Sequence, residues 1–165
     1  MQPVSIAFGA MLMCVAAGQA MAQVSPADRT FATKAAYGGH AEVALGQLAT
    51  ANAGTPQIRA FGERMVTDHS QANQALEEIG HRQDLNLPAG PDSSDLATEQ
   101  RLREMKGQAF DAAYMHDMVQ DHQQDIADFQ HEAQDGKDPA LRGFAQKYLP
   151  ILQQHLRMAE AAEPK

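Results

Sequence analysis

The 165-residue sequence has one cysteine and no tryptophan, and it is short of positive charge. Aromatic residues make up 5% of it, and 13 lysines and arginines against 21 aspartates and glutamates leave a formal net charge of −8. This balance disfavours nucleic acid and anionic membrane surfaces as partners, and it leaves a cationic partner or a metal ion open. β-Branched residues are sparse, while Ala, Leu, Gln, Met, Glu and Asp dominate. That usage is typical of an all-α protein.

The first 22 residues contain no charged side chain and end in the small-residue cleavage pattern A-M-A. We interpret residues 1–22 as a secretory signal peptide, which leaves a mature domain over residues 23–165. The apolar run is too short to span a bilayer comfortably, and no later segment is apolar enough to do so. The one cysteine, Cys14, lies in the leader, where the preceding Met13 disfavours a lipid anchor. The sequence therefore predicts a periplasmic protein without disulfides or thiolate metal ligands.

Capping residues followed by proline mark the starts of the expected helices, as in Ser25-Pro26, Thr55-Pro56 and Asp138-Pro139. A loop rich in Pro, Gly, Asp and Ser, LNLPAGPDSS, follows the second helix and is long enough to cross a helical bundle. Asp95 is the expected cap of the short helix after it. Pro150 predicts a kink in the last helix. The predicted helices span about 26–51, 56–84, 96–105, 107–134 and 139 to 159.

The helices repeat in sequence. TPQIRAFGERM aligns with DPALRGFAQKY at an offset of 83 residues, and a weaker alignment at an offset of 79 pairs Phe31 with Phe110 and Glu42 with Asp121. The chain therefore reads as two copies of one helical hairpin, joined by a long connection after the second helix. Two such hairpins with one long crossover form a ferritin-like up-down four-helix bundle, which is the fold we expect.

Each long helix places one side chain that can bind metal within its apolar stripe. The motif M-V-x-D-H occurs on two helices from different hairpins and supplies His69 and His122, while Glu42 and His155 lie on the other two helices. A buried carboxylate among neutral imidazoles is well compensated by a divalent cation, so these four residues are the predicted ligands of one metal ion. Counted from the turn of its own hairpin, each of the first three lies within about 6 Å along the axis, and His155 extends the spread to about 10 Å.

Other polar residues near these positions are expected to support the ligands. Asp68 and Asp121 precede two of the histidines, point about 100° away from them and could orient ligands across a helix interface. Tyr114 and Tyr148 lie one or two turns from histidines on the same stripes and could donate hydrogen bonds into the site. A metal-free network, in which carboxyl, hydroxyl and imidazole groups satisfy one another, is the alternative. The remaining histidines and the scattered methionines are assigned to solvent and to core packing.

Four stretches carry a resemblance to a known family: FATKAAYGGHAEVALGQLA, FGERMVTDHSQAN, GQAFDAAYMHDMVQDHQQDIADF and FAQKYLPILQQHL. Over about residues 28–162 the chain resembles the DUF4142 family of exported bacterial proteins, which implies a ferritin-like fold and leaves the function open. Tyr148 stands where the family usually has threonine, which changes the hydrogen bonding expected near His155. The family's motifs fall on Glu42, Asp68, His69, Tyr114, Asp121, His122 and His155.

Three functions are compatible with these observations. The first is a periplasmic protein that binds one divalent ion, which could be zinc, iron, copper or manganese. Three histidines and a carboxylate fill a tetrahedral site, so this hypothesis assigns no catalytic residue and favours a structural or storage role. The second is a redox enzyme that acts on peroxide or oxygen, which requires an open coordination position. The third is a metal-free envelope-stress or structural protein that works through its surface, with an unknown protein partner.

Overall fold

The computed structural model describes residues 24–163, so the expected signal peptide (residues 1–22) and Cys14 lie outside the described part of the chain. Over the described residues the protein is all-α, as predicted, and no strand is present. None of these helices has an apolar stretch long enough to cross a membrane. The helices are α1 (Pro26–Asn52), α2 (Pro56–Gln83), α3 (Ser93–Arg103), α4 (Gly107–Asp135) and α5 (Pro139–Ala162).

The helices begin where capping side chains satisfy their first backbone N–H groups. Ser25, Thr55 and Asp138 accept hydrogen bonds at the starts of α1, α2 and α5, and proline follows each of them. The predicted cap of α3 is wrong: the helix begins three residues earlier, at the capping box that Asp92 forms with Asp95. A capping box binds two otherwise unpaired N–H groups, so it outcompetes the single cap expected from Asp95. α5 continues through Pro150.

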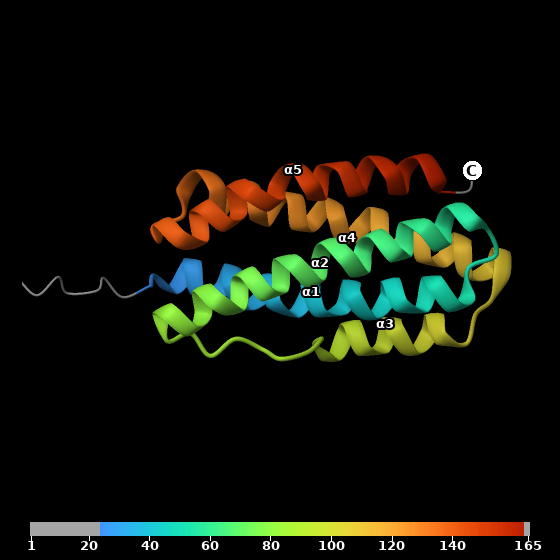
Figure 1. The fold of residues 1–165 in the computed structure, drawn as a ribbon, viewed down its shortest axis with the longest axis horizontal. Coiled ribbons are helices and arrows are strands. Elements are labelled where there is room, and N and C mark those ends of the chain that lie inside the picture. Colours follow the sequence, from blue (N-terminus) through green and yellow to red (C-terminus); the bar gives the residue numbers. More distant parts are fainter. Residues whose placement is uncertain (1–23, 164–165) are drawn as a thin grey trace, which may run out of the picture.

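The four long helices lie side by side along the long axis of the molecule, and α3 lies outside them against α1 and α4 (Figure 1). α1 pairs with α2 and α4 with α5, while α2 contacts α5 and α1 contacts α4 across the two hairpins. The segment between α2 and α4, which contains α3, runs back along the full length of the helices (Figure 1). The two hairpin turns therefore lie at opposite ends.

Each hairpin turn is held by a buried aspartate of the other hairpin. Asp111 of α4 accepts hydrogen bonds from the backbone N–H groups of Gly54 and Thr55 in the α1–α2 turn, at 2.9 and 3.1 Å. Asp28 of α1 does the same for two N–H groups of the α4–α5 turn, at 3.1 and 2.9 Å. We call Asp28 and Asp111 the turn anchors. Each one ties the start of one hairpin to the bend of the other.

The turn anchors and the residues they bind are related by the same offset of 83 residues as α2 and α5. The weaker alignment, which pairs Phe31 with Phe110 at an offset of 79, is therefore wrong by four residues. Four residues are close to one helical turn of about 3.6 residues, so the shift keeps each side chain on nearly the same face. The periodicity alone cannot distinguish the two registers. At the corrected offset, the equivalent of Glu42 is Asp125.

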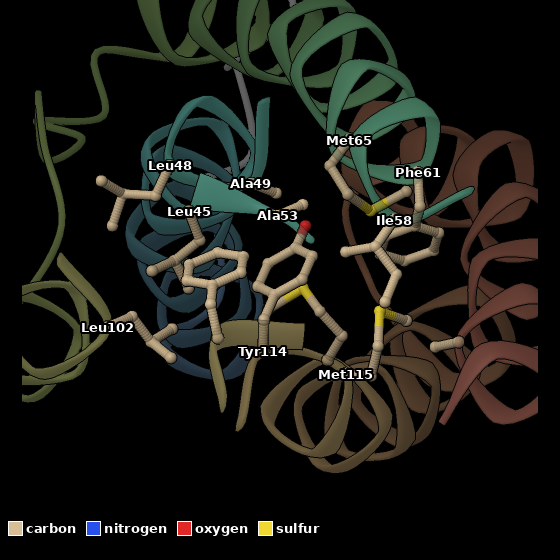
Figure 2. Packing of buried hydrophobic residues seen from close by; sticks show 13 residues of the cluster. Leu45, Leu48, Ala49, Ala53, Ile58, Phe61, Met65, Leu102, Tyr114 and Met115 are labelled. Atoms are coloured by element: carbon tan, nitrogen blue, oxygen red, sulfur yellow. The ribbon is translucent and has the colours of Figure 1, made fainter. Parts of the chain in front are cut away.

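Two apolar clusters fill the ends of the interior. One lies toward the α1–α2 turn and includes Met65, Tyr114 and Met118 (Figure 2). The other lies toward the α4–α5 turn and includes Leu76 and Phe129. On every long helix, one buried polar residue lies between members of the two clusters. These residues are Glu42, His69, His122 and His155, with exposed fractions of 0, 5, 0 and 0%.

Candidate metal centre

Three histidines from α2, α4 and α5 converge in the layer between the two apolar clusters. The ring centroid of His69 lies 5.9 Å from that of His122 and 5.3 Å from that of His155, and the last two lie 5.3 Å apart. One ring nitrogen from each histidine lies within 4.8 Å of the other two. Three imidazoles are thus close enough together to share one ion.

His155 lies level with the other histidines, so the spread of about 10 Å expected from the sequence is wrong. That count measured each helix from its own turn, and the two turns lie at opposite ends (Figure 1). Contacts between α5 and α2 set the true height. Tyr148 donates to the backbone oxygen of Gln71 at 3.2 Å, and His155 contacts Asp68 at 2.8 Å.

Hydrogen bonds determine which nitrogen of two histidines carries the proton. Nδ1 of His122 lies 2.9 Å from the backbone oxygen of Met118, which can only accept, so Nδ1–H is the donor. Nε2–H of His155 donates to Asp68 at 2.8 Å. Partial burial opposes ionisation of Asp68, but hydrogen bonds from Arg64 and His155 outweigh it and lower the pKa of this carboxyl. It is therefore an acceptor at neutral pH.

The two remaining nitrogens, Nε2 of His122 and Nδ1 of His155, face each other at 3.3 Å. Burial lowers the pKa of His155 to about 4 and also lowers the pKa of His122, so both rings are neutral near pH 7. Two lone pairs then point at one another without a proton between them. Nitrogens that bind one tetrahedral ion at about 2.0–2.1 Å lie about 3.3–3.4 Å apart. The donor set and its spacing therefore fit a divalent ion.

Glu42 lies beside these histidines and outside the three-nitrogen group. Its carboxylate oxygens lie 2.7 Å from Nε2 of His69 and 3.2 Å from Nδ1 of His122. Despite these short distances, neither oxygen nor the His69 nitrogen has a contact with hydrogen-bond geometry. Burial raises the pKa of Glu42, and the nearby His122 opposes this rise. Burial also lowers the pKa of His69 to about 4.

Glu42 instead groups with two aspartates of α4. One carboxylate oxygen each from Glu42, Asp121 and Asp125 lies within 4.8 Å of the others. The structure thus divides the four predicted ligands over two groups, and it places Asp121 with Glu42 rather than against a histidine. Burial, followed by the charge of Glu42, raises the pKa of Asp121 to about 8, and the same causes raise the pKa of Asp125 well above its usual value.

Asp125 is the residue that sequence reasoning missed. It lies four residues after Asp121 and so on the same face of α4, and it is the equivalent of Glu42 at the offset of 83. The register of 79 paired Glu42 with Asp121 and hid this equivalence. A correct alignment of α1 on α4 was the available signal.

The two tyrosines do not donate to the histidines. Tyr114 packs against Phe61 and Phe110 in the apolar cluster, with ring centroids 6.0 and 5.3 Å away (Figure 2). Its buried hydroxyl has no hydrogen-bond partner, and burial raises its pKa, with the charge of Glu42 adding to the rise. Tyr148 donates to the backbone of α2. Both residues shape the walls around the site.

A small cavity adjoins the histidine group. Its volume is about 20 Å³, and its lining includes His69, His155, Asp68, Asp125 and Tyr148. A space of this size holds one water molecule, and the polar lining offers that molecule several partners. The histidine group therefore has room beside it for one small additional ligand.

Comparison with known proteins identifies a family and a fold. The family model described as "Domain of unknown function (DUF4142)" matches residues 14–162. Among solved structures, the chain is similar to a DUF305 fragment from Deinococcus radiodurans, with a TM-score of 0.72 and 14% sequence identity. The match covers 84% of this chain and 96% of that one, and at this identity it shows the fold alone. No curated protein matches the sequence.

Proposed function

The chain belongs to the DUF4142 family, whose function is unknown, and we propose that in this member three buried histidines hold one divalent metal ion. The observation that carries the proposal is the pair of lone-pair nitrogens of His122 and His155, which face each other at 3.3 Å. His69 completes the set. Imidazole nitrogens suit zinc, iron and copper, and a neighbouring carboxylate also admits manganese, so the donor set does not choose among these metals.

The protein's own groups orient the ligands. The backbone oxygen of Met118 and the carboxylate of Asp68 each accept the N–H on the far side of an imidazole, which fixes the tautomer and the ring plane. Arg64 donates to Asp68 and so holds that carboxylate in place. Partners of this kind raise the basicity of a ligating histidine.

Three nitrogen ligands leave one position of a tetrahedral site open, and the adjoining cavity accommodates one water molecule there. This vacancy supports a second candidate function, in which the metal acts on a small molecule such as peroxide or oxygen. The cavity is too small for a larger substrate. Binding or storage of the ion is the primary proposal, and turnover of peroxide by the metal-loaded protein separates the two.

We also propose that the protein works in the periplasm and that its helices form a ferritin-like arrangement. The uncharged apolar leader that ends in A-M-A supports export. Two helical hairpins with turns at opposite ends, joined by a crossover along their length, support the ferritin-like topology (Figure 1).

Zinc titration of chelator-treated protein, followed by elemental analysis, tests the metal site. We expect about one ion per wild-type chain, and an affinity at least ~100-fold lower in His122→Ala because a ligand is lost. Asp68→Asn should weaken binding by about 10- to 100-fold, the usual effect of losing a histidine's hydrogen-bond partner. His81→Ala is the matched control, because the side chain of His81 is 80% exposed and far from the site.

The proposal fails if wild-type protein binds no zinc, iron, copper or manganese, or if His122→Ala binds as wild type does. A wild-type protein without metal whose stability drops in His122→Ala would instead support the metal-free hydrogen-bond network.

A further inference from the structure

The carboxylates of Glu42, Asp121 and Asp125 form a group that the histidine site does not use. One oxygen from each lies within 4.8 Å of the other two, and the residues come from facing helices, α1 and α4. Oxygens that bind one Ca²⁺ or Mn²⁺ ion at about 2.1–2.5 Å lie at most about 4.2–5 Å apart. The spacing is therefore that of a ligand set.

Glu42 distinguishes this group from an ordinary acidic surface. It is 0% exposed, and neither of its oxygens has a hydrogen-bond partner. Within residues 24–163, no lysine or arginine forms an ion pair with Glu42, Asp121 or Asp125. A buried carboxylate is stable only with compensation by a donor or a cation. Its unsatisfied oxygens are aimed at the two aspartates, and a cation between them would satisfy all three.

A surface groove leads to this group. It has a volume of about 280 Å³ and is lined by residues of α1, α3 and α4, among them Asp95, Asp117 and Asp121. Besides burial, the nearby charge of Asp95 raises the pKa of each of the three clustered carboxyls. Asp95 is fixed by the capping box at the start of α3. The crossover helix thus brings a further negative charge to the entrance, which favours entry of a cation.

We propose that Glu42, Asp121 and Asp125 form a second cation site, which takes a hard divalent ion such as Mn²⁺ through oxygen ligands. It is distinct from the histidine site and does not require it. Glu42 borders both, since one of its oxygens lies 2.7 Å from His69. Oxygen-only ligands select harder cations than three imidazoles do, so the two sites differ in the metal they prefer.

Titration with Mn²⁺, followed by the loss of its free-ion electron paramagnetic resonance signal, tests this site. The full chain is used after its histidine site has been filled with zinc. We expect about one Mn²⁺ per wild-type chain and an affinity at least ~10-fold lower in Asp125→Asn and in Asp121→Asn. Asp117→Asn is the matched control, because Asp117 lines the same groove but pairs with Arg101 at 2.6 Å. It should change the affinity less than ~2-fold, as a screened charge effect.

Thermal unfolding of the metal-free variants separates a lost ligand from a lost fold. Asp125→Asn should unfold at or above the wild-type temperature, since it removes one of three crowded carboxyls. The proposal is overturned if wild-type protein binds no Mn²⁺ at millimolar concentration, or if Asp117→Asn weakens binding as much as Asp125→Asn does. His155→Ala should still bind Mn²⁺, so failure of the histidine site is distinguishable from failure of this one.

Discussion

The α1–α2 and α4–α5 hairpins can be compared residue by residue, because equivalent turn contacts lie 83 residues apart. Their turns are alike: each is held by an aspartate of the other hairpin, and each is spanned by an arginine, with Arg59 donating to Ala53 and Arg142 to Gly136. Their interiors differ. The three histidines occupy α2, α4 and α5, and none has a histidine at its equivalent position. The repeat therefore specifies the frame of the fold, while the chemistry depends on departures from it.

The helix contacts of the two hairpins differ as well. α1 and α2 approach closely at Gly46 and Gly62, where an added Cβ on Gly62 would lie 2.7 Å from the backbone oxygen of Gly46. The equivalent residues of α4 and α5 are Phe129 and Ala145, whose buried side chains fill the second interface. The first hairpin thus packs through its backbones and the second through side chains.

Removal of a turn anchor should have the largest effect. Asp111→Asn leaves at most one acceptor for two backbone N–H groups, and charged hydrogen bonds of this kind contribute about 1.5–3 kcal/mol each. We expect a loss of about 2–4 kcal/mol in the free energy of unfolding, measured by urea denaturation. Asp28→Asn should cost less, because the nearby Glu132 carboxyl is relieved of a negative neighbour. Equal losses would mean that the two anchors work in the same electrostatic setting.

Filling the close helix contact should have the next largest effect. In Gly62→Ala the new Cβ would lie 2.6 Å from that of Ala49, so α1 and α2 must move apart, and overpacking of this kind costs about 1–3 kcal/mol. Gly143→Ala in the second hairpin is the matched control, because nothing lies within 4 Å of its added Cβ. It should stabilise the protein by about 0.5–1 kcal/mol through helix propensity. Thermal or urea unfolding of both variants decides, and a stable Gly62→Ala would contradict the close approach.

The smallest effect concerns pH and distinguishes the two turns. Burial, together with the charges of Asp28 and Asp138, raises the pKa of Glu132 from 4.5 to about 7. The folded protein therefore binds a proton that the unfolded chain releases between these values. This contribution to stability is complete below about pH 4.5 and is lost as the pH rises through 7. Ala49 occupies the equivalent position at the other turn, which lacks this dependence.

Glu132→Gln should remove that part of the pH dependence. Urea unfolding at pH 5 and pH 8 should show wild type losing about 1 kcal/mol more than the variant between the two pH values. Asp111→Asn serves as the comparison, since its loss in stability should be the same at both pH values. An unchanged slope in Glu132→Gln would place the titrating group elsewhere.

Much of this molecule is readable from the sequence because its signals are local. Helix starts follow from capping residues and prolines at Ser25, Thr55 and Asp138, which bond their own first turns. Polar interruptions of apolar stripes identify the buried residues of the central layer, because a stripe reports burial whatever its partner is. These two signals suffice for the fold class and for a short set of candidate site residues.

The grouping of those residues was not readable from the sequence, because it depends on how helices are placed against one another. A shift of about one turn leaves every stripe intact, so Glu42 was paired with Asp121 and its true equivalent, Asp125, was overlooked. Heights counted from turns at opposite ends misplaced His155 for a similar reason. Only the contacts between helices separate the histidine group from the carboxylate group.

The turn anchors also have a consequence for the order of folding. The N–H group of Asp138 finds its acceptor, Asp28, 110 residues away, and that of Gly54 finds Asp111 at a distance of 57. Neither bend can complete its hydrogen bonds until the opposite pair of helices has arrived, although each bend joins neighbouring helices. Local closure and global assembly are thereby made one event. A hairpin produced as a separate polypeptide would keep two unpaired donors at its bend, so the smallest cooperative unit of folding comprises both hairpins together.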